Sequence, residues 1–149
     1  MRFLGIDYGT KRIGLAISDD SGRIAFPKEI VKNDSTAVSR IGSIIKDERI
    51  EGVVIGESSD LNGNDNTIQG KIKSFANELK QLSLVEVVFQ KEFMTSVEAR
   101  RTKIFKKDRD QTGASSRVKK DVGEKVDAKA AMLILQRYLD KRNIKGNLN

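Results

Sequence analysis

The residues best suited to chemistry are two carboxylates that follow short apolar runs. Asp7 closes the apolar stretch Phe3–Ile6 and is followed closely by Gly9 and Thr10, and Glu92 comes just after another apolar stretch. Apolar runs of this length predict buried strands, and a glycine lets the backbone turn tightly after the first one. An ionised carboxylate at the end of a buried strand must be paired, hydrogen-bonded or bound to a metal ion. The alternative is a turn former for Asp7 and a surface residue for Glu92.

The composition removes most other catalytic chemistries. The 149 residues include no histidine and no cysteine, which excludes a Ser-His-Asp triad, a thiolate nucleophile and the usual zinc sites. Carboxylates, hydroxyls, lysines and metals with oxygen ligands, such as Mg²⁺ or Mn²⁺, remain. No apolar run approaches the roughly 18 residues of a membrane span, and no signal-peptide pattern opens the chain. We expect a cytoplasmic protein with no membrane segment, folded as a single domain over residues 1–149.

The positive charge is concentrated in one segment. The formal net charge is +7, and nine Lys and Arg face only two Asp between Arg100 and Lys120, so this segment carries the whole excess. A local basic patch points to a polyanionic partner, whereas the alternative is a solvated charged loop. We predict a loop over residues 106–120. Its cations expected to bind nucleic acid are Lys106, Lys107, Arg117, Lys119 and Lys120.

The elements that must position these residues form an α/β pattern. Five short runs, apolar or alternating, predict strands at Phe3–Ile6, Arg12–Ser18, Ile24–Val31, Gly52–Gly56 and Val85–Phe89. The first three follow one another through short turns, which predicts an antiparallel meander. Pro27, the only proline, favours a sheet edge or a bulge for the third strand.

Four helices are expected between and after the strands. Their predicted starts are Asp34 or Ser35, Asn66, the capping box Thr95–Glu98, and Val126 or Asp127. We expect the tail, residues 141–149, to fray. This order predicts a mixed five-stranded sheet with helices on both faces, in which sites lie outside the carboxyl ends of the strands.

Four stretches of the chain resemble the YqgF/RuvX-type proteins. In chain order they are Gly5–Gly14, Val54–Gly56 with the loop at Asn62-Gly63, Glu92–Ala99 and Val126–Ala131, and the resemblance runs from Arg2 to about Asp140. These proteins are described as pre-16S rRNA nucleases or Holliday-junction-resolvase-like proteins. The resemblance therefore implies a ribonuclease H-like fold for this chain.

The resemblance also implies a site and a function. The family's three active-site carboxylates fall on Asp7, Glu92 and Asp127, as catalytic residues and ligands of Mg²⁺ or Mn²⁺. Phosphodiester hydrolysis of the two-metal type uses ions about 3.5–4 Å apart, held by oxygen ligands. The implied function is 5′ maturation of pre-16S rRNA in ribosome biogenesis, with branched DNA as another substrate. Asp127 has the alternative of a helix N-terminal residue that matches the macrodipole.

The turn after Asp7 is expected to contact the substrate. Thr10, Lys11 and Arg12 are the residues that we expect to touch phosphate, and their alternative is a solvated turn.

The sequence does not indicate whether the protein is a monomer or a weak dimer.

The chain departs from the family pattern beside one carboxylate. Where the family commonly has Asp-Glu-Arg, this chain has Lys91-Glu92-Phe93; Ser58 stands where a proline is usual, and Asn62 where an aspartate is usual. A missing arginine removes a bidentate phosphate contact. A second hypothesis is therefore a nucleic-acid-binding protein with weak or lost nuclease activity. A third, an ATP-handling domain suggested by Asp7-x-Gly9-Thr10, would need a second similar domain for which 149 residues leave no room.

Overall fold

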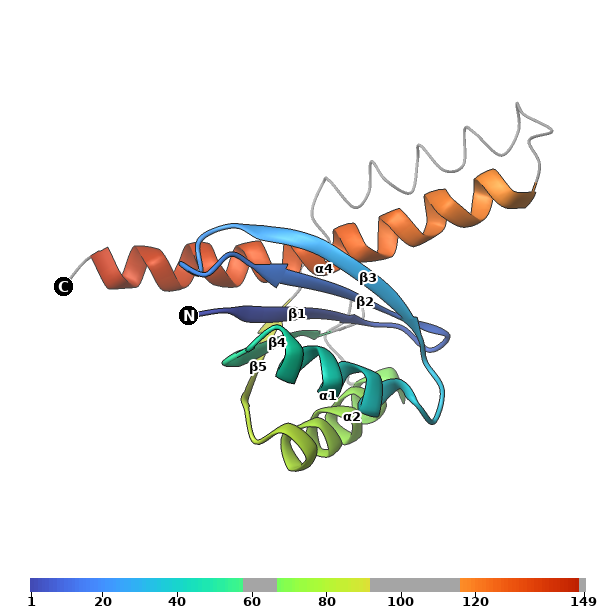
Figure 1. The fold of residues 1–149 in the computed structure, drawn as a ribbon, viewed down its shortest axis with the longest axis horizontal. Coiled ribbons are helices and arrows are strands. Elements are labelled where there is room, and N and C mark those ends of the chain that lie inside the picture. Colours follow the sequence, from blue (N-terminus) through green and yellow to red (C-terminus); the bar gives the residue numbers. More distant parts are fainter. Residues whose placement is uncertain (58–66, 92–115, 148–149) are drawn as a thin grey trace.

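The computed structural model describes residues 1–57, 67–91 and 116–147, with Thr67, residues 116–127 and Asn147 described by their backbone alone. A five-stranded mixed sheet in the order β3-β2-β1-β4-β5 forms its centre (Figure 1). Its strands are β1 (Phe3–Tyr8), β2 (Arg12–Ser18), β3 (Ala25–Lys32), β4 (Gly52–Glu57) and β5 (Glu86–Lys91). β1, β2 and β3 pair antiparallel, whereas β4 pairs parallel with β1 and with β5. The predicted meander and the two added parallel strands are confirmed.

The proline lies where the sequence predicted. β3 is the edge strand of the meander, and its register with β2 shifts between Leu15 and Ala16. Leu15 pairs with Glu29 and Ala16 with Pro27, so Lys28 is the extra residue of a bulge. Pro27 thus lies on an edge strand and beside a bulge, two places that tolerate its missing N–H.

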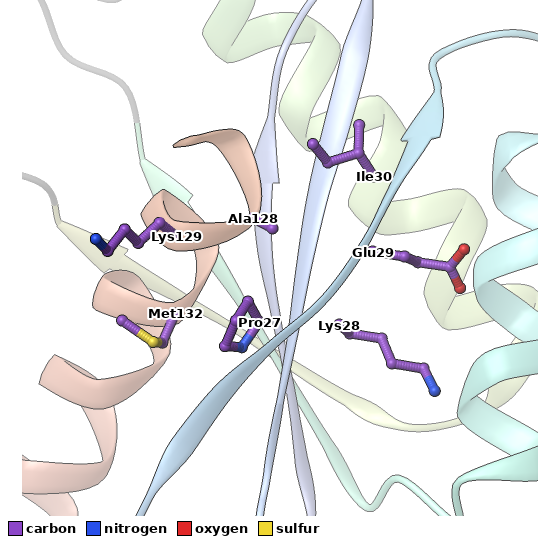
Figure 2. Close-up of a pocket in the computed structure, with 7 residues that line it drawn as sticks. All are labelled: Pro27, Lys28, Glu29, Ile30, Ala128, Lys129 and Met132. Atoms are coloured by element: carbon purple, nitrogen blue, oxygen red, sulfur yellow. The ribbon is translucent and has the colours of Figure 1, made fainter. Parts of the chain in front are cut away.

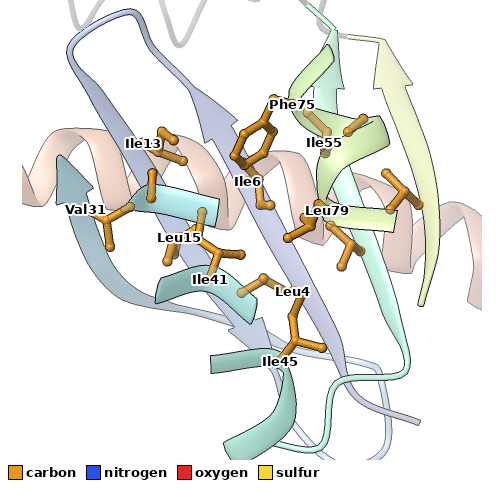
Figure 3. Close-up of a cluster of buried hydrophobic side chains, with 14 of the residues drawn as sticks. Leu4, Ile6, Ile13, Leu15, Val31, Ile41, Ile45, Ile55, Phe75 and Leu79 are labelled. Carbon is orange, nitrogen blue, oxygen red and sulfur yellow. The ribbon is translucent and has the colours of Figure 1, made fainter. Parts of the chain in front are cut away.

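In the described part of the chain, two helices cover one face of the sheet. They are α1 (Ala37–Asp47) and α2 (Thr67–Ser83), and Figure 3 shows the apolar cluster that they enclose with the strands. The central strand β1 contributes Leu4 and Ile6, both with no exposed surface. Tyr8, at the end of β1, packs against Phe75 of α2 with 5.1 Å between ring centroids.

The long helix α4 (Ser116–Asn147) crosses the opposite face (Figure 1). Its buried residues Ala131, Ile134, Leu135 and Leu139 pack against side chains such as Phe3 and Val54. The prediction of helices on both faces is therefore confirmed. Within the described part of the chain, no helix is both long and apolar enough to span a membrane.

The first helix begins later than predicted. The residue before α1 is Thr36, and no side chain caps the helix there. The Asp34 carboxylate accepts hydrogen bonds from the Thr36 backbone N–H and hydroxyl, at 2.9 and 2.6 Å. Asp34 thus forms the turn that leads into α1, and the prediction of Asp34 or Ser35 as its cap is wrong, because the local bond competes with capping.

The last helix is longer than predicted at both ends. It begins at Ser116 instead of Val126 or Asp127, so the predicted loop is wrong for residues 116–120. Arg117, Lys119 and Lys120 lie on α4, because Lys, Arg and Glu are good helix formers even without an apolar stripe. The helix also continues past Lys141 to Asn147. Asn143 Nδ2 donates a hydrogen bond to the Gly22 carbonyl at 3.2 Å, which fastens this end to the β2–β3 turn.

Some of the predicted features lie outside the described residues. They are Asn66, the capping box Thr95–Glu98 and the remainder of the predicted loop, residues 106–115.

Candidate active site

Asp7 lies at the carboxyl end of the central strand, on the face that α4 covers. Side chains alternate along a strand, and Leu4 and Ile6 point into the α1–α2 core, so Phe3, Gly5 and Asp7 point to the other face. Asp7 is half-buried and pairs with Gly14 of β2. This agrees with the position predicted from the apolar run before it.

The neighbours of Asp7 on both sides are glycines. On β4, Ile55 pairs with Ile6, so the next residue, Gly56, adjoins Asp7; Gly56 in turn pairs with Gln90 of β5. Together with Gly14 and Ile30 of β3, these residues form one row across the sheet. In this row, therefore, neither β2 nor β4 places a side chain beside the Asp7 carboxylate.

Helix α4 crosses β1 in close contact. A β-carbon at Gly5 would lie 2.7 Å from the Leu135 β-carbon and 2.9 Å from the Ala131 carbonyl oxygen. At the start of β1, Phe3 instead meets Tyr138, with 5.6 Å between ring centroids. From Phe3 to Gly5 along β1, the contacting residues of α4 therefore shift toward the helix N-terminus, from Tyr138 to Leu135 and Ala131. Two further residues along β1 correspond to about one helical turn, so the turn of α4 that contains Asp127 is expected to be level with Asp7.

The turn after Asp7 is held by a residue that the sequence analysis did not identify. Asn33, just after β3, donates a hydrogen bond from Nδ2 to the Gly9 carbonyl at 2.8 Å. Its backbone N–H donates to the Lys11 carbonyl at 3.0 Å. A β-carbon at Gly9 would lie 2.5 Å from the Arg12 carbonyl oxygen, so this tight turn requires glycine. The sequence signal for this role is only an asparagine that directly follows an edge strand.

Positive charge gathers around this turn. Thr10, Lys11 and Arg12 are exposed, and Arg12 pairs in register with the exposed Lys32 of β3. The nearby acid is Asp34; hydrogen bonds from Thr36 lower its pKa, and the charges of Lys32 and Arg40 lower it further. Asp34 is therefore an ionised but already hydrogen-bonded group among several cations.

The other expected site residues are only partly described. Glu92, Lys106 and Lys107 lie outside the described residues, and Asp127, Arg117, Lys119 and Lys120 are placed by the α4 backbone alone. Within the described residues no three His, Cys, Asp or Glu come together as a metal-binding group. Asp7 by itself offers the hard carboxylate oxygens that Mg²⁺ and Mn²⁺ prefer.

Comparison with known proteins assigns the sequence to a family. Residues 1–141 match the family described as "RuvX: Holliday junction resolvase". The chain belongs to the RuvX family. A relative from Sulfurihydrogenibium sp. (strain YO3AOP1), named "Putative pre-16S rRNA nuclease", is 36% identical over 142 residues, covering 94% of this chain and 90% of the relative. A relative of the same name from Thermoanaerobacter pseudethanolicus is 36% identical over 147 residues, covering 97% and 100%.

Solved structures show the fold of this RuvX-family chain. The T. thermophilus RuvC structure in complex with a Holliday junction substrate has a TM-score of 0.58 at 16% identity, covering 95% of this chain and 96% of that one. The Fowlpox virus resolvase in complex with Holliday junction DNA has a TM-score of 0.56 at 14% identity, covering 95% and 98%. The ribonuclease H-like architecture implied by the sequence resemblance is confirmed.

Proposed function

We propose that this RuvX-family chain is a nuclease that hydrolyses phosphodiester bonds, with Asp7, Glu92 and Asp127 as its catalytic carboxylates. The observation that supports this most directly is the position of Asp7. It is half-buried at the carboxyl end of the central strand, between Gly14 and Gly56, on the face crossed by α4. Binding sites of open α/β sheets lie at this end of the strands.

A divalent metal centre is part of the proposal. Asp7, Glu92 and Asp127 would hold Mg²⁺ or Mn²⁺, and bound ions would supply activation of the attacking water and neutralisation of the leaving oxygen. The task of Asp7 is to remain ionised and fixed in direction. Its place on a strand hydrogen-bonded on both sides gives that rigidity, which loops rarely provide.

The proposed substrate is structured RNA, in 5′ maturation of pre-16S rRNA in the cytoplasm. The names of the curated relatives support this choice, and the family description and the RuvC likeness make branched DNA the alternative to include in any test. Thr10, Lys11 and Arg12 would contact phosphates near Asp7. Arg117, Lys119 and Lys120 on α4, with Lys106 and Lys107 before it, would bind the backbone farther away.

A cleavage assay tests the proposal. Precursor 16S rRNA and a four-way DNA junction are each incubated with the purified protein, with Mg²⁺, with Mn²⁺ and with chelator. We expect metal-dependent cleavage that Asp7→Asn abolishes and that Asp47→Asn, an exposed change on α1, leaves intact. Undiminished cleavage by Asp7→Asn would refute the assignment of Asp7 as a catalytic carboxylate of a nuclease.

A nucleic-acid-binding protein with weak or lost nuclease activity is the second candidate. The feature that favours it is Lys91, an exposed cation at the end of β5 where the family commonly has an acid. This candidate predicts salt-sensitive binding without turnover, weakened when Lys106, Lys107, Lys119 and Lys120 are neutralised. A binding affinity that did not change with salt concentration would count against both candidates.

A further inference from the structure

A groove of about 710 Å³ lies between the edge strand β3 and helix α4 (Figure 2). In the described part of the chain, Pro27–Ile30 line it on the strand side, and Ala128, Lys129 and Met132 line it on the helix side. It opens on the face of the sheet that carries Asp7, since α4 covers that face. Neither the family resemblance nor the comparisons assign it a role.

The lining residues include four apolar residues and three charged ones, Lys28, Glu29 and Lys129. Pro27, Ile30, Ala128 and Met132 supply apolar surface, and Lys129 is exposed beside them. The bulge turns the neighbouring charges away: Figure 2 shows Lys28 and Glu29 on the far side of the strand from the helix. Lys28 Nζ lies 2.9 Å from Glu48 Oε1 at the end of α1, so its charge is already paired there.

One end of the groove leads toward Asp7. Ile30 pairs with Gly14, and Gly14 pairs with Asp7, so all three lie in one row of the sheet. Two strand spacings, roughly 10 Å, separate Ile30 from Asp7 in this row, and the glycine between them carries no side chain. On the helix side, Ala128 directly follows Asp127. Within the sheet, therefore, no strand side chain stands between the Ile30 end of the groove and Asp7 in that row.

Cations stand at the same end. Arg12 and Lys32 pair across β2 and β3, and strand alternation puts both on the face of Ile30. Both are exposed, and among the described residues neither takes part in an ion pair. The acid beside them, Asp34, is hydrogen-bonded to Thr36. Lys129 thus places positive charge beside the apolar floor of the groove, and Arg12 and Lys32 place more beyond its Ile30 end.

We propose that the β3–α4 groove binds a single nucleic-acid strand that flanks the phosphate to be cleaved, a role that rests on the proposed nuclease function. An unpaired strand presents phosphates and exposed bases together, which suits cations beside an apolar floor. A duplex presents mainly phosphates and would leave the floor unused. The chemistry recognised is shared by single-stranded RNA and DNA, so both are tested.

Site-directed cross-linking tests the location. The chain has no cysteine, so Met132→Cys introduces a unique thiol into the groove. An oligonucleotide with a pyridyl-disulfide group is added, in RNA and DNA forms, with Ca²⁺ in place of Mg²⁺. A bound strand presents its reactive group at a high effective concentration, so we expect cross-linking about tenfold faster than with Ser43→Cys. Ser43 is exposed on α1 and lines a different groove, of about 510 Å³.

Salt dependence of binding tests the cations. For a fluorescent single strand, the double change Lys32→Gln with Lys129→Gln should reduce the slope of log K against log salt by about 1.4, at about 0.7 per phosphate contact. Lys46→Gln, which removes an exposed cation of α1 beside the groove that Ser43 lines, should leave the slope unchanged. An equal effect of both changes, or no effect of either, would overturn the proposal.

The outcomes separate this proposal from the proposed function. If the wild type cleaves RNA but the Met132→Cys and Ser43→Cys variants cross-link at the same rate, the groove proposal fails and the nuclease stands. If cross-linking is specific but the wild type cleaves nothing, the groove proposal stands as a binding site and the nuclease fails. Suppression of cross-linking by an acidic peptide, but not by an unmodified strand, would assign the groove to a protein partner and overturn the proposal.

Discussion

Gly5 of β1 lies directly against Ala131 of α4, so closely that a β-carbon on Gly5 would stand 2.9 Å from the Ala131 carbonyl oxygen. The absence of a side chain lets the helix backbone reach the central strand. Ala131, which has no exposed surface, is one helical turn after Asp127. The Gly5 contact therefore sets the height of α4 above β1, and with it the separation between Asp127 and Asp7.

Gly5→Ala should destabilise the fold and impair cleavage. The added methyl also approaches the Leu135 β-carbon to 2.7 Å, so α4 must move, and overpacking of this kind costs about 1–3 kcal/mol. Urea unfolding measures the loss, and cleavage is assayed at a temperature where the variant is folded. The control is Gly70→Ala in α2, where a β-carbon meets nothing within 4 Å. It should stabilise by about 0.5–1 kcal/mol, and equal effects of the two changes would contradict the close approach.

Asn33→Ala should weaken substrate binding by more than the accompanying loss of folding stability would explain. The change removes the 2.8 Å bond to the Gly9 carbonyl and frees the turn that carries Thr10 and Lys11. Loss of such a bond costs about 1 kcal/mol of stability. We expect KM for the nucleic acid to rise while kcat changes less, because the turn is proposed to contact phosphate and not the reacting atoms.

The chain offers a matched control for Asn33. Asn143 Nδ2 also donates to a glycine carbonyl, that of Gly22 at 3.2 Å, at the opposite end of the sheet. Asn143→Ala should cost comparable stability and leave KM unchanged. A similar rise in KM for both variants would show that general loosening, and not the position of the turn, is responsible.

The local sequence pattern was sufficient to predict the strands and the position of the carboxylate at the end of β1. The predicted and observed bounds of β2 agree, Arg12–Ser18, because an alternating run between two turn signals leaves little choice. Asp7 could be placed because Phe3–Ile6 must be buried. Gly56 could not be assigned to the site, since its place beside Asp7 follows from the parallel pairing of β1 with β4, a contact between distant segments.

Long-range contacts and, for the start of α4, local helix propensity account for the features that the sequence analysis did not predict. The bond from Asn33 to Gly9 joins residues 24 positions apart, and no local motif announces it. The C-terminal turns of α4 carry few apolar residues, but Arg142 stacks over the Phe3 ring at 5.1 Å, which favours helix where fraying was expected. The early start of α4 at Ser116 reflects helix propensity without an apolar stripe, which periodicity does not detect.

Acid should destabilise the β2–β3 turn through Asp19. Hydrogen bonds from the Ser21 hydroxyl and from the Ile24 and Arg23 backbone N–H groups lower the pKa of Asp19 from 3.8 to about 2. The ionised form is thus favoured in the folded state, so its contribution is complete above 3.8 and disappears as pH falls toward 2. Asp19→Asn should flatten the dependence of Tm on pH in that window. In an NMR titration, Ser21→Ala should raise the pKa of Asp19; an unchanged value would refute this account.

The proposed metal centre predicts a stability effect that does not depend on turnover. An ion that binds the folded chain at ten times its Kd should raise the free energy of unfolding by about 1.4 kcal/mol. We expect Mg²⁺ or Mn²⁺ to raise Tm of the wild type, chelator to reverse the rise, and Asp7→Asn to abolish it. Asp47→Asn removes one exposed carboxylate from α1, far along the chain from the carboxyl end of β1, and should respond like the wild type. If Asp7→Asn gained as much stability from the ion as the wild type, then Asp7 would not be a ligand, and any cleavage would have to be explained by another site.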